Sequence, residues 1–219
     1  MIRPVAEQQR RSELWRRALA RDARNLLRHG RGAPLWCERI WLDASSCSDS
    51  YGRFKATNSG DVIGGDWDKQ TYPFDRNPIA AACLRHWRDG LSWEESGAYE
   101  LQLERIKRHG AQGSDGCRTL EDVIQRYKQL DELFLTAKRE RRLRPRSETD
   151  GHTFRERDGI LIHISRDCRP IFGHRGVHRF VIGRLLGLRV VPAQIGVVHP
   201  KAINAWRTNF SRAVQTTRA

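Results

Sequence analysis

Residues 172–180 decide the fold that we expect, and they have the sequence Phe172-Gly173-His174-Arg175-Gly176-Val177-His178-Arg179-Phe180. An extended segment enters a short loop with two glycines, and the loop opens into a helix with apolar residues at helical spacing. The first turn of a helix presents unpaired N–H groups and the positive end of the helix dipole, which favour an anion. Glycine lets the backbone approach a ligand closely, and arginine adds charged donors. The stretch therefore predicts a phosphate-binding turn, with a basic surface turn as the alternative.

The residues around this stretch predict a small mixed sheet. Residues 160–164 form a short run rich in β-branched side chains, a tight turn follows at 166–169, and 170–172 returns as a second strand. The helix over 177–186 ends before Gly187, and 190–198 supplies another strand. Earlier in the chain, 36–44 is typical of an extended strand, and a turn-rich stretch continues to residue 65.

The remaining segments are mainly helical. Residues 6–29 predict a basic helix, and 204–218 predicts a final one. Between them, Asn77-Pro78, the capping box Ser92–Glu95 and Thr119 each begin a helix. We therefore expect an α+β protein with a basic helical arm at 1–35 and a single domain at 36–219. That domain has a three-helix insertion at about 77–145, a polar linker at 147–158 and a motif-bearing core at 158–200.

The composition is strongly basic, with 40 Lys and Arg residues against 26 Asp and Glu, a net charge of +14. Arginine is concentrated in the arm, in the tract 138–146 and around the 174–179 loop. Such a charge favours anionic partners, namely nucleic acid, nucleotides, phosphorylated sugars or an anionic membrane surface. A solvated basic surface with no dedicated partner is the alternative.

The cysteines and the apolar runs favour a cytoplasmic protein. Five scattered cysteines without a C-x-x-C pair indicate reduced thiols rather than a disulfide framework. No run approaches the roughly 18 apolar residues of a transmembrane segment. The first residues also lack the apolar stretch of a secretory signal.

A second motif, Gly64-Gly65-Asp66-Trp67-Asp68, places two carboxylates on either side of a tryptophan. In an extended segment both carboxylates would lie on one face and Trp67 on the other. They could then hold Mg²⁺ bridged to a nucleotide's phosphates, or one could act as a general base. The alternative is that Asp66 caps a turn while Trp67 anchors the loop in the core.

Other candidate groups carry weaker signals. His174 and His178 are four residues apart, but no third zinc ligand is evident, so phosphate contact or plain turn chemistry is favoured over a metal. His199 could reach the same site, with a surface position as its default. The tryptophans could stack on bases, although most fall on apolar faces and are more simply explained as core.

The last third of the chain resembles the ParB/sulfiredoxin-like superfamily. The resemblance is carried by the β-hairpin, by Gly176-Val177-His178-Arg179, by the helix ending Leu185-Leu186-Gly187-Leu188 and by Val191-Pro192-Ala193-Gln194-Ile195. Residues 39–44 look like the opening strand of that family. The G-D-W-D motif and the three helices after it are similar to a subgroup of ParB-like proteins.

The resemblance implies a ParB/sulfiredoxin-like small mixed sheet in which the turn before the helix holds nucleotide phosphates. Its phosphate-binding residues would be Gly173, His174, Arg175, Gly176, Val177, His178 and Arg179. It further implies a Mg²⁺-dependent phosphotransferase or NTPase that uses ATP or CTP and acts on a small hydroxyl-bearing or phosphorylated acceptor. Asp66, Asp68 and His178 would be catalytic, and Asp66 and Asp68 would bind the metal.

Two departures from the family pattern limit what the resemblance implies. Arg175 stands where the free-serine-kinase members have an aspartate, which weakens a direct transfer of their mechanism. Val177 stands where sulfiredoxin has its cysteine, which disfavours peroxiredoxin repair. One alternative is a nucleic-acid-binding or regulatory module without catalysis, in which the arm and the 138–146 tract contact backbone phosphates. A protein-interaction scaffold is the other.

Overall fold

The computed structural model describes residues 5–110, 115–149 and 154–211. Within these residues, six strands form one mixed sheet in the order β1-β6-β4-β5-β2-β3. β6 runs parallel to β4 and β5 parallel to β2, while the other neighbours are antiparallel. The predicted α+β class is confirmed. The strands are β1 (Arg39–Leu42), β2 (Asp49–Ser50), β3 (Tyr72–Pro73), β4 (Ile160–Ile164), β5 (Pro170–Phe172) and β6 (Val191–Val198).

The two central strands, β4 and β6, are buried along their whole length. On one face of the sheet, Ile160, Ile162 and Ile164 belong to the main core together with Phe180 of α6 (Val177–Leu185). On the other face, His163 lies within 6.4 Å of the rings of Tyr51, Phe54 and Trp67. A central strand covered on both sides is largely apolar, which explains why β4 has isoleucine or leucine at every position except His163.

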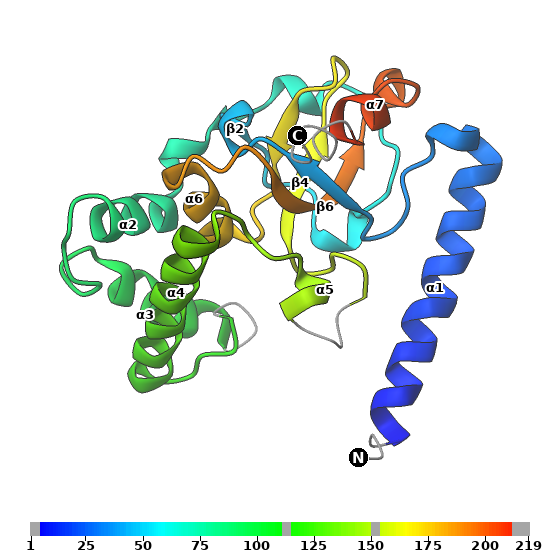
Figure 1. Ribbon diagram of the computed structural model, residues 1–219. Helices are drawn as coiled ribbons and strands as arrows, with labels where there is room; N and C mark the ends of the chain where they lie inside the picture. Colours follow the sequence, from blue (N-terminus) through cyan, green and yellow to red (C-terminus); the bar gives the residue numbers. More distant parts are fainter. Residues whose placement is uncertain (1–4, 111–114, 150–153, 212–219) are drawn as a thin grey trace.

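The predicted insertion forms three helices that pack around α6 on one side of the sheet (Figure 1). They are α2 (Pro78–Trp87), α3 (Ala98–His109) and α4 (Leu120–Glu140). Asn77 caps α2 by accepting from the amides of Ile79 and Ala80, as predicted. Thr119 and Asp122 form a capping box at the start of α4. The Ser92–Glu95 box also forms, but α3 begins only at Ala98, because the chain turns at Gly97 with φ +77°.

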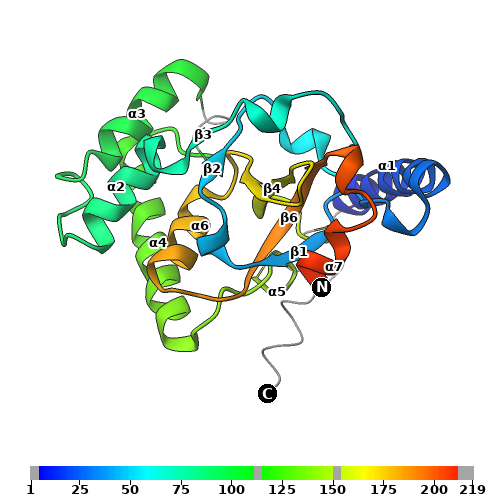
Figure 2. The same ribbon diagram turned by 90° about the horizontal axis from the view of Figure 1, so that it is seen from above.

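The arm helix α1 (Val5–His29) lies across the sheet from the insertion (Figure 2). A small apolar cluster, in which Ala18 packs with Phe154, and several polar contacts attach it. Arg21 pairs with Asp61 at 2.5 Å, and Asp22 accepts from the backbone N–H of Trp36 at 2.7 Å. Asn25 donates to the carbonyl of Gly60 at 2.6 Å. Several large apolar side chains of the helix stay exposed, namely Trp15, Leu19, Leu26 and Leu27.

The two remaining helices are short, α5 (Arg146–Thr149) in the predicted linker and α7 (Trp206–Ser211) beside β1. The predicted final helix over 204–218 is thus confirmed in part, and its residues beyond 211 lie outside the described residues. No described helix combines the length and the apolar composition that crossing a membrane requires.

Candidate functional site

The loop before α6 is packed tightly against the beginning of β4. Gly176 has φ +74°, and a Cβ at this position would lie 2.8 Å from the Cα of Ile160 and 2.9 Å from the carbonyl oxygen of Gly159. Only glycine combines this left-handed conformation with so close an approach. His174 also has a positive φ of +64°, so two residues of this loop adopt the left-handed conformation before the helix begins.

The first turn of α6 has no cap. No side chain accepts a hydrogen bond from its amides, and Gly176 at the N-cap position has no side chain to do so. Within the described residues, the backbone N–H groups of Val177, His178 and Arg179 have no hydrogen-bond acceptor at all. Three unpaired amides at the positive end of a helix dipole are the arrangement that the sequence predicts for an anion.

The side chains of His178 and Arg179 point into the protein rather than into solvent. Each residue is only 7% exposed. Arg179 donates to the carbonyl of Arg144 at the end of the insertion, and its charge acts on the buried Glu156. Burial lowers the pKa of Arg179 to about 10, while the charge of Glu156 opposes that effect.

His178 lies on the side of α6 that faces α4. Its ring meets the ring of Tyr127 edge-on, with centroids 5.7 Å apart. Its Nε2 atom is buried and has no hydrogen-bond partner among the described residues. Burial lowers the pKa of His178 to about 4, so its imidazole is neutral near pH 7. This histidine therefore keeps one buried polar atom without a partner.

The loop residues before α6 contact their neighbours on the sheet. Arg175 pairs with Asp158 at 2.6 Å, and His174 is hydrogen-bonded to the hydroxyl of Tyr72. The amide of Gly173 donates to the carbonyl of Leu161 at 2.8 Å. His174 and Arg175 are both exposed, so they are the residues of this loop that a ligand in solution meets first.

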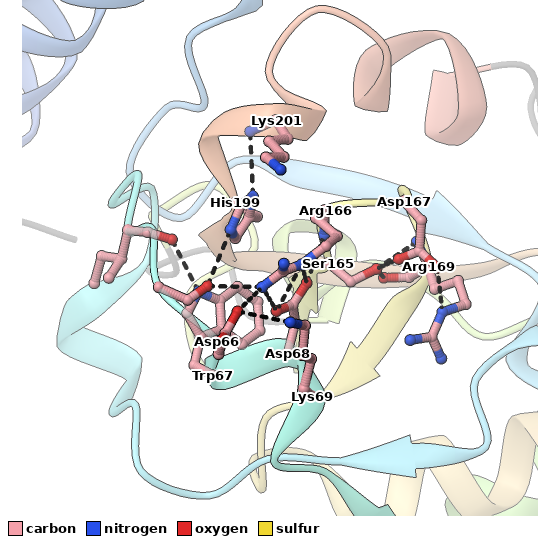
Figure 3. Close-up of polar contacts among 12 residues, drawn as sticks. Asp66, Trp67, Asp68, Lys69, Ser165, Arg166, Asp167, Arg169, His199 and Lys201 are labelled. Carbon is pink, nitrogen blue, oxygen red and sulfur yellow. Dashed lines mark hydrogen bonds and ion pairs between the residues drawn. The ribbon is translucent and has the colours of Figure 1, made fainter.

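The two carboxylates of the G-D-W-D motif contact one guanidinium group (Figure 3). Arg166, in the turn after β4, approaches Asp68 with Nη2 at 2.7 Å and with Nε at 2.9 Å. The same Nη2 reaches Asp66 at 2.6 Å and the carbonyl of Gly65 at 2.9 Å. Asp68 is buried, whereas Asp66 is exposed and also pairs with Lys69. These contacts lower the pKa of Asp68 to about 2.

The prediction that this motif is extended is wrong. Residues Trp67–Lys69 form a 3₁₀ turn, with Asp66 at its N-cap position but without a side-chain cap. Trp67 is buried and donates from Nε1 to the carbonyl of Ile63 at 2.8 Å, so it anchors the loop in the core as the alternative interpretation proposed. Among the described residues, no group of three or more His, Cys, Asp or Glu side chains is placed to hold a metal ion.

The structure does not bring the two motifs together. Gly176 packs against Gly159 and Ile160 at the start of β4, whereas Arg166, which holds Asp66 and Asp68, follows the end of that strand. At about 3.3 Å per residue, the two ends of this five-residue strand are roughly 13 Å apart. The carboxylates and the α6 turn thus form two separate polar centres.

The other candidate groups belong to structural contacts. His199 faces the carbonyl of Gly65 at 3.2 Å and accepts from the amide of Lys201, so it lies with the G-D-W-D motif (Figure 3). Cys168 is partly exposed, and burial raises the pKa of its thiol, which makes it less reactive. No disulfide joins the cysteines, all of which lie in the described residues.

Several residues that build these centres carry no recognisable signal in the sequence. Arg166, Tyr72, Asp158 and Glu156 become visible only through contacts with residues far away in the chain. Comparison with known proteins adds no further assignment, because no family model, curated protein or solved structure matches the chain.

Proposed function

We propose that this protein binds the phosphates of a nucleotide, with ATP and CTP as the first candidates, at the first turn of α6. The proposal includes a ParB/sulfiredoxin-like arrangement of the sheet around that turn and a cytoplasmic location. The observation that carries it is the set of three unpaired amides at Val177, His178 and Arg179. Phosphate oxygens accept well from such amides, and the helix dipole adds a favourable field.

The exposed loop residues supply further donors for a phosphate. Arg175 is about half exposed, and its only ion pair among the described residues is with Asp158, which is also largely exposed. An exposed pair of this kind contributes little to stability, so the guanidinium can turn to a phosphate at small cost. His174 lies beside it in the same loop.

The binding test is calorimetric titration of the full chain with ATP, CTP and GTP in the presence of Mg²⁺. We expect at least one of them to bind, and Arg175→Ala to weaken it about tenfold, because a charge-assisted hydrogen bond is lost. Arg189→Ala is the matched control, since Arg189 is an exposed arginine beyond the other end of α6. Failure of all three nucleotides to bind would refute the proposal.

For a nucleotide bound at this turn, we propose phosphoryl transfer to a small hydroxyl-bearing or phosphorylated acceptor. Mg²⁺ would arrive with the nucleotide, and positioning and charge would supply most of the catalysis. His174 and Asp158 are the groups beside the loop that could handle a proton. Asp66 and Asp68 stay a separate prediction as metal ligands, because Arg166 neutralises them at the other end of β4.

A nucleotide hydrolysis assay distinguishes these assignments. If His174 takes part in proton transfer, His174→Ala lowers the turnover rate and Asp66→Asn leaves it unchanged. If Asp66 holds the metal, the order is reversed. The predicted catalytic role of His178 is tested by the same assay with His178→Gln.

Binding to nucleic acid is the second candidate, and the exposed arginines of α1 favour it. Arg16, Arg24 and Arg28 have no acidic partner among the described side chains. The arginines of the 138–146 tract are less available to a nucleic acid, since Glu140 pairs with both Arg142 and Arg144. Gel shifts over a range of salt concentrations test this candidate, which predicts a steep loss of binding as salt rises. A full chain that shifts neither DNA nor RNA at low salt excludes it.

A further inference from the structure

The environment of His178 contains more than one group without a partner. Its own Nε2 is buried and unpartnered, and the same is true of the Nε atom of Arg126 on α4. The charges of Arg126 and of Arg105 on α3 both act on the imidazole of His178. Two unpartnered nitrogen atoms therefore lie where the insertion faces α6, and the positive charges of two arginines act on this region. Such groups remain unsatisfied until an acceptor reaches them.

An acidic residue, Asp115, lies close to Arg126. Asp115, just before α4, has a carboxylate oxygen 3.9 Å from Nη2 of Arg126, at the outer limit of an ion pair. Its charge also acts on His178, in the direction opposite to that of the two arginines. Asp115 is 46% exposed at its side chain, so it can leave this position for solvent without an unpaired buried charge.

We propose that the helical insertion forms the second wall of the phosphate site at α6, in which Arg126 binds the anion and Asp115 occupies its place when the ligand is absent. The inference rests on the proposed function for the identity of the ligand, but not for the site itself. A phosphate at this position would accept from the unpaired amides of α6 and from the side chains of Arg126 and His178. It would also displace the carboxylate of Asp115 from the guanidinium group of Arg126.

The arrangement leaves part of the site exposed and part of it buried in the free protein, since the side chains of Arg126 and Asp115 are 35% and 46% exposed. The orphaned nitrogen atoms of His178 and Arg126 are both covered from solvent. A ligand that reaches these atoms must therefore displace a group that covers them, and Asp115 is the partly exposed acid whose negative charge a phosphate would replace. The affinity for the anion is then lowered by competition with that carboxylate.

Two pairs of variants test the inference in the full chain. Arg126→Ala removes a cation from the site, and Lys128→Ala is its matched control, an exposed cation on the same helix. Asp115→Asn removes the competing carboxylate, and Glu121→Gln is its control, an exposed acid in the first turn of α4. Thermal unfolding of each variant shows that it is folded.

Calorimetric titration with the nucleotide panel and with inorganic pyrophosphate provides the readout. We expect Arg126→Ala to weaken binding at least tenfold and Asp115→Asn to strengthen it severalfold, with both controls within about twofold of wild type. Nucleotide binding that is equally unaffected by all four variants overturns the inference and leaves the proposed function intact.

The titration with pyrophosphate tests the site independently of the nucleotide that we propose as its ligand. Pyrophosphate binding that depends on Arg126, without binding of any nucleotide, supports the site and overturns the nucleotide as its ligand. Absence of binding by both probes, even to Asp115→Asn, overturns both proposals.

Discussion

Arg166 holds the buried carboxylate of Asp68 from two sides, with Nη2 at 2.7 Å and Nε at 2.9 Å, and adds its own backbone N–H at 2.9 Å. The two residues are 98 positions apart in the sequence, so this contact fastens the G-D-W-D loop to the turn after β4. Because Asp68 is buried, the pair is shielded from the solvent that weakens exposed ion pairs.

Replacement of Asp68 by asparagine is expected to lower the free energy of unfolding by about 2 kcal/mol near pH 7. The pKa of Asp68 falls from 3.8 to about 2 in the folded protein, chiefly through hydrogen bonds from Arg166. A shift of this size corresponds to about 2 kcal/mol, present above the unfolded pKa and lost as the pH falls from about 4 towards 2. Urea denaturation measures it. Asp66→Asn is the control, and an equal loss in both variants would contradict the prediction.

Alanine at position 176 is expected to destabilise the protein more than alanine at position 187, at the two ends of α6. Both glycines have positive φ, but a Cβ at Gly187 meets no atom within 4 Å, whereas one at Gly176 meets the backbone of β4. Gly187→Ala should cost about 1 kcal/mol from backbone strain, and Gly176→Ala about 3 kcal/mol from strain plus overlap. Urea denaturation of both variants gives the comparison. Similar losses would show that the loop can move away from β4.

The protein is expected to lose stability as the pH falls below about 6.5. Burial lowers the pKa of His163 to about 3 and that of His178 to about 4, from 6.5. Between these values the unfolded chain takes up protons that the folded chain does not, so each histidine contributes a slope of up to about 1.4 kcal/mol per pH unit. Urea denaturation between pH 7 and 5 measures the slope. His178→Gln should reduce this slope by the contribution of one histidine, and an unchanged slope would rule out this contribution.

Asp131 is expected to be the acidic residue of the insertion whose replacement destabilises the protein most. Its carboxylate accepts from the indoles of Trp87 and Trp93, each at 2.8 Å, and from His86 at 3.0 Å. Asp131→Ala leaves these donors without their acceptor, and we expect a loss of about 2 to 4 kcal/mol. Asp89→Ala, at an exposed acid beyond the end of α2, should cost little. Denaturation followed by tryptophan fluorescence reports directly on this region, and equal losses would contradict the role of Asp131.

Features that depend on neighbouring residues could be predicted from the sequence. The cap at Asn77, the capping box at Thr119 and the strand at 160–164 all follow from residue types within a few positions of one another. The short loop before α6 could be predicted for the same reason, because Gly173 and Gly176 stand at the two ends of a four-residue span.

The burial of His178 and Arg179 could not be predicted in this way. The helical period identifies Val177, Phe180, Val181 and Leu185 as the inward side; the structure confirms that the first three are buried and places Leu185, partly buried, against the same core. It cannot reveal that the insertion covers the opposite side, because that contact joins residues about 50 positions apart. The strands β2 and β3 were missed because each has only two residues and depends on partners elsewhere in the chain.

The polar attachment of α1 has a consequence for how the molecule opens. α1 is held by a few ion pairs and hydrogen bonds and by one small apolar cluster, in which Ala18 packs with Phe154, while Leu27 is 88% exposed. It buries much less apolar surface than the central strands do, so we expect it to open as a separate unit. Its amide hydrogens should exchange with solvent well before those of β4 and β6. We therefore expect the arm to detach and return while the sheet remains folded, which would let its arginines meet a partner independently of the rest of the protein.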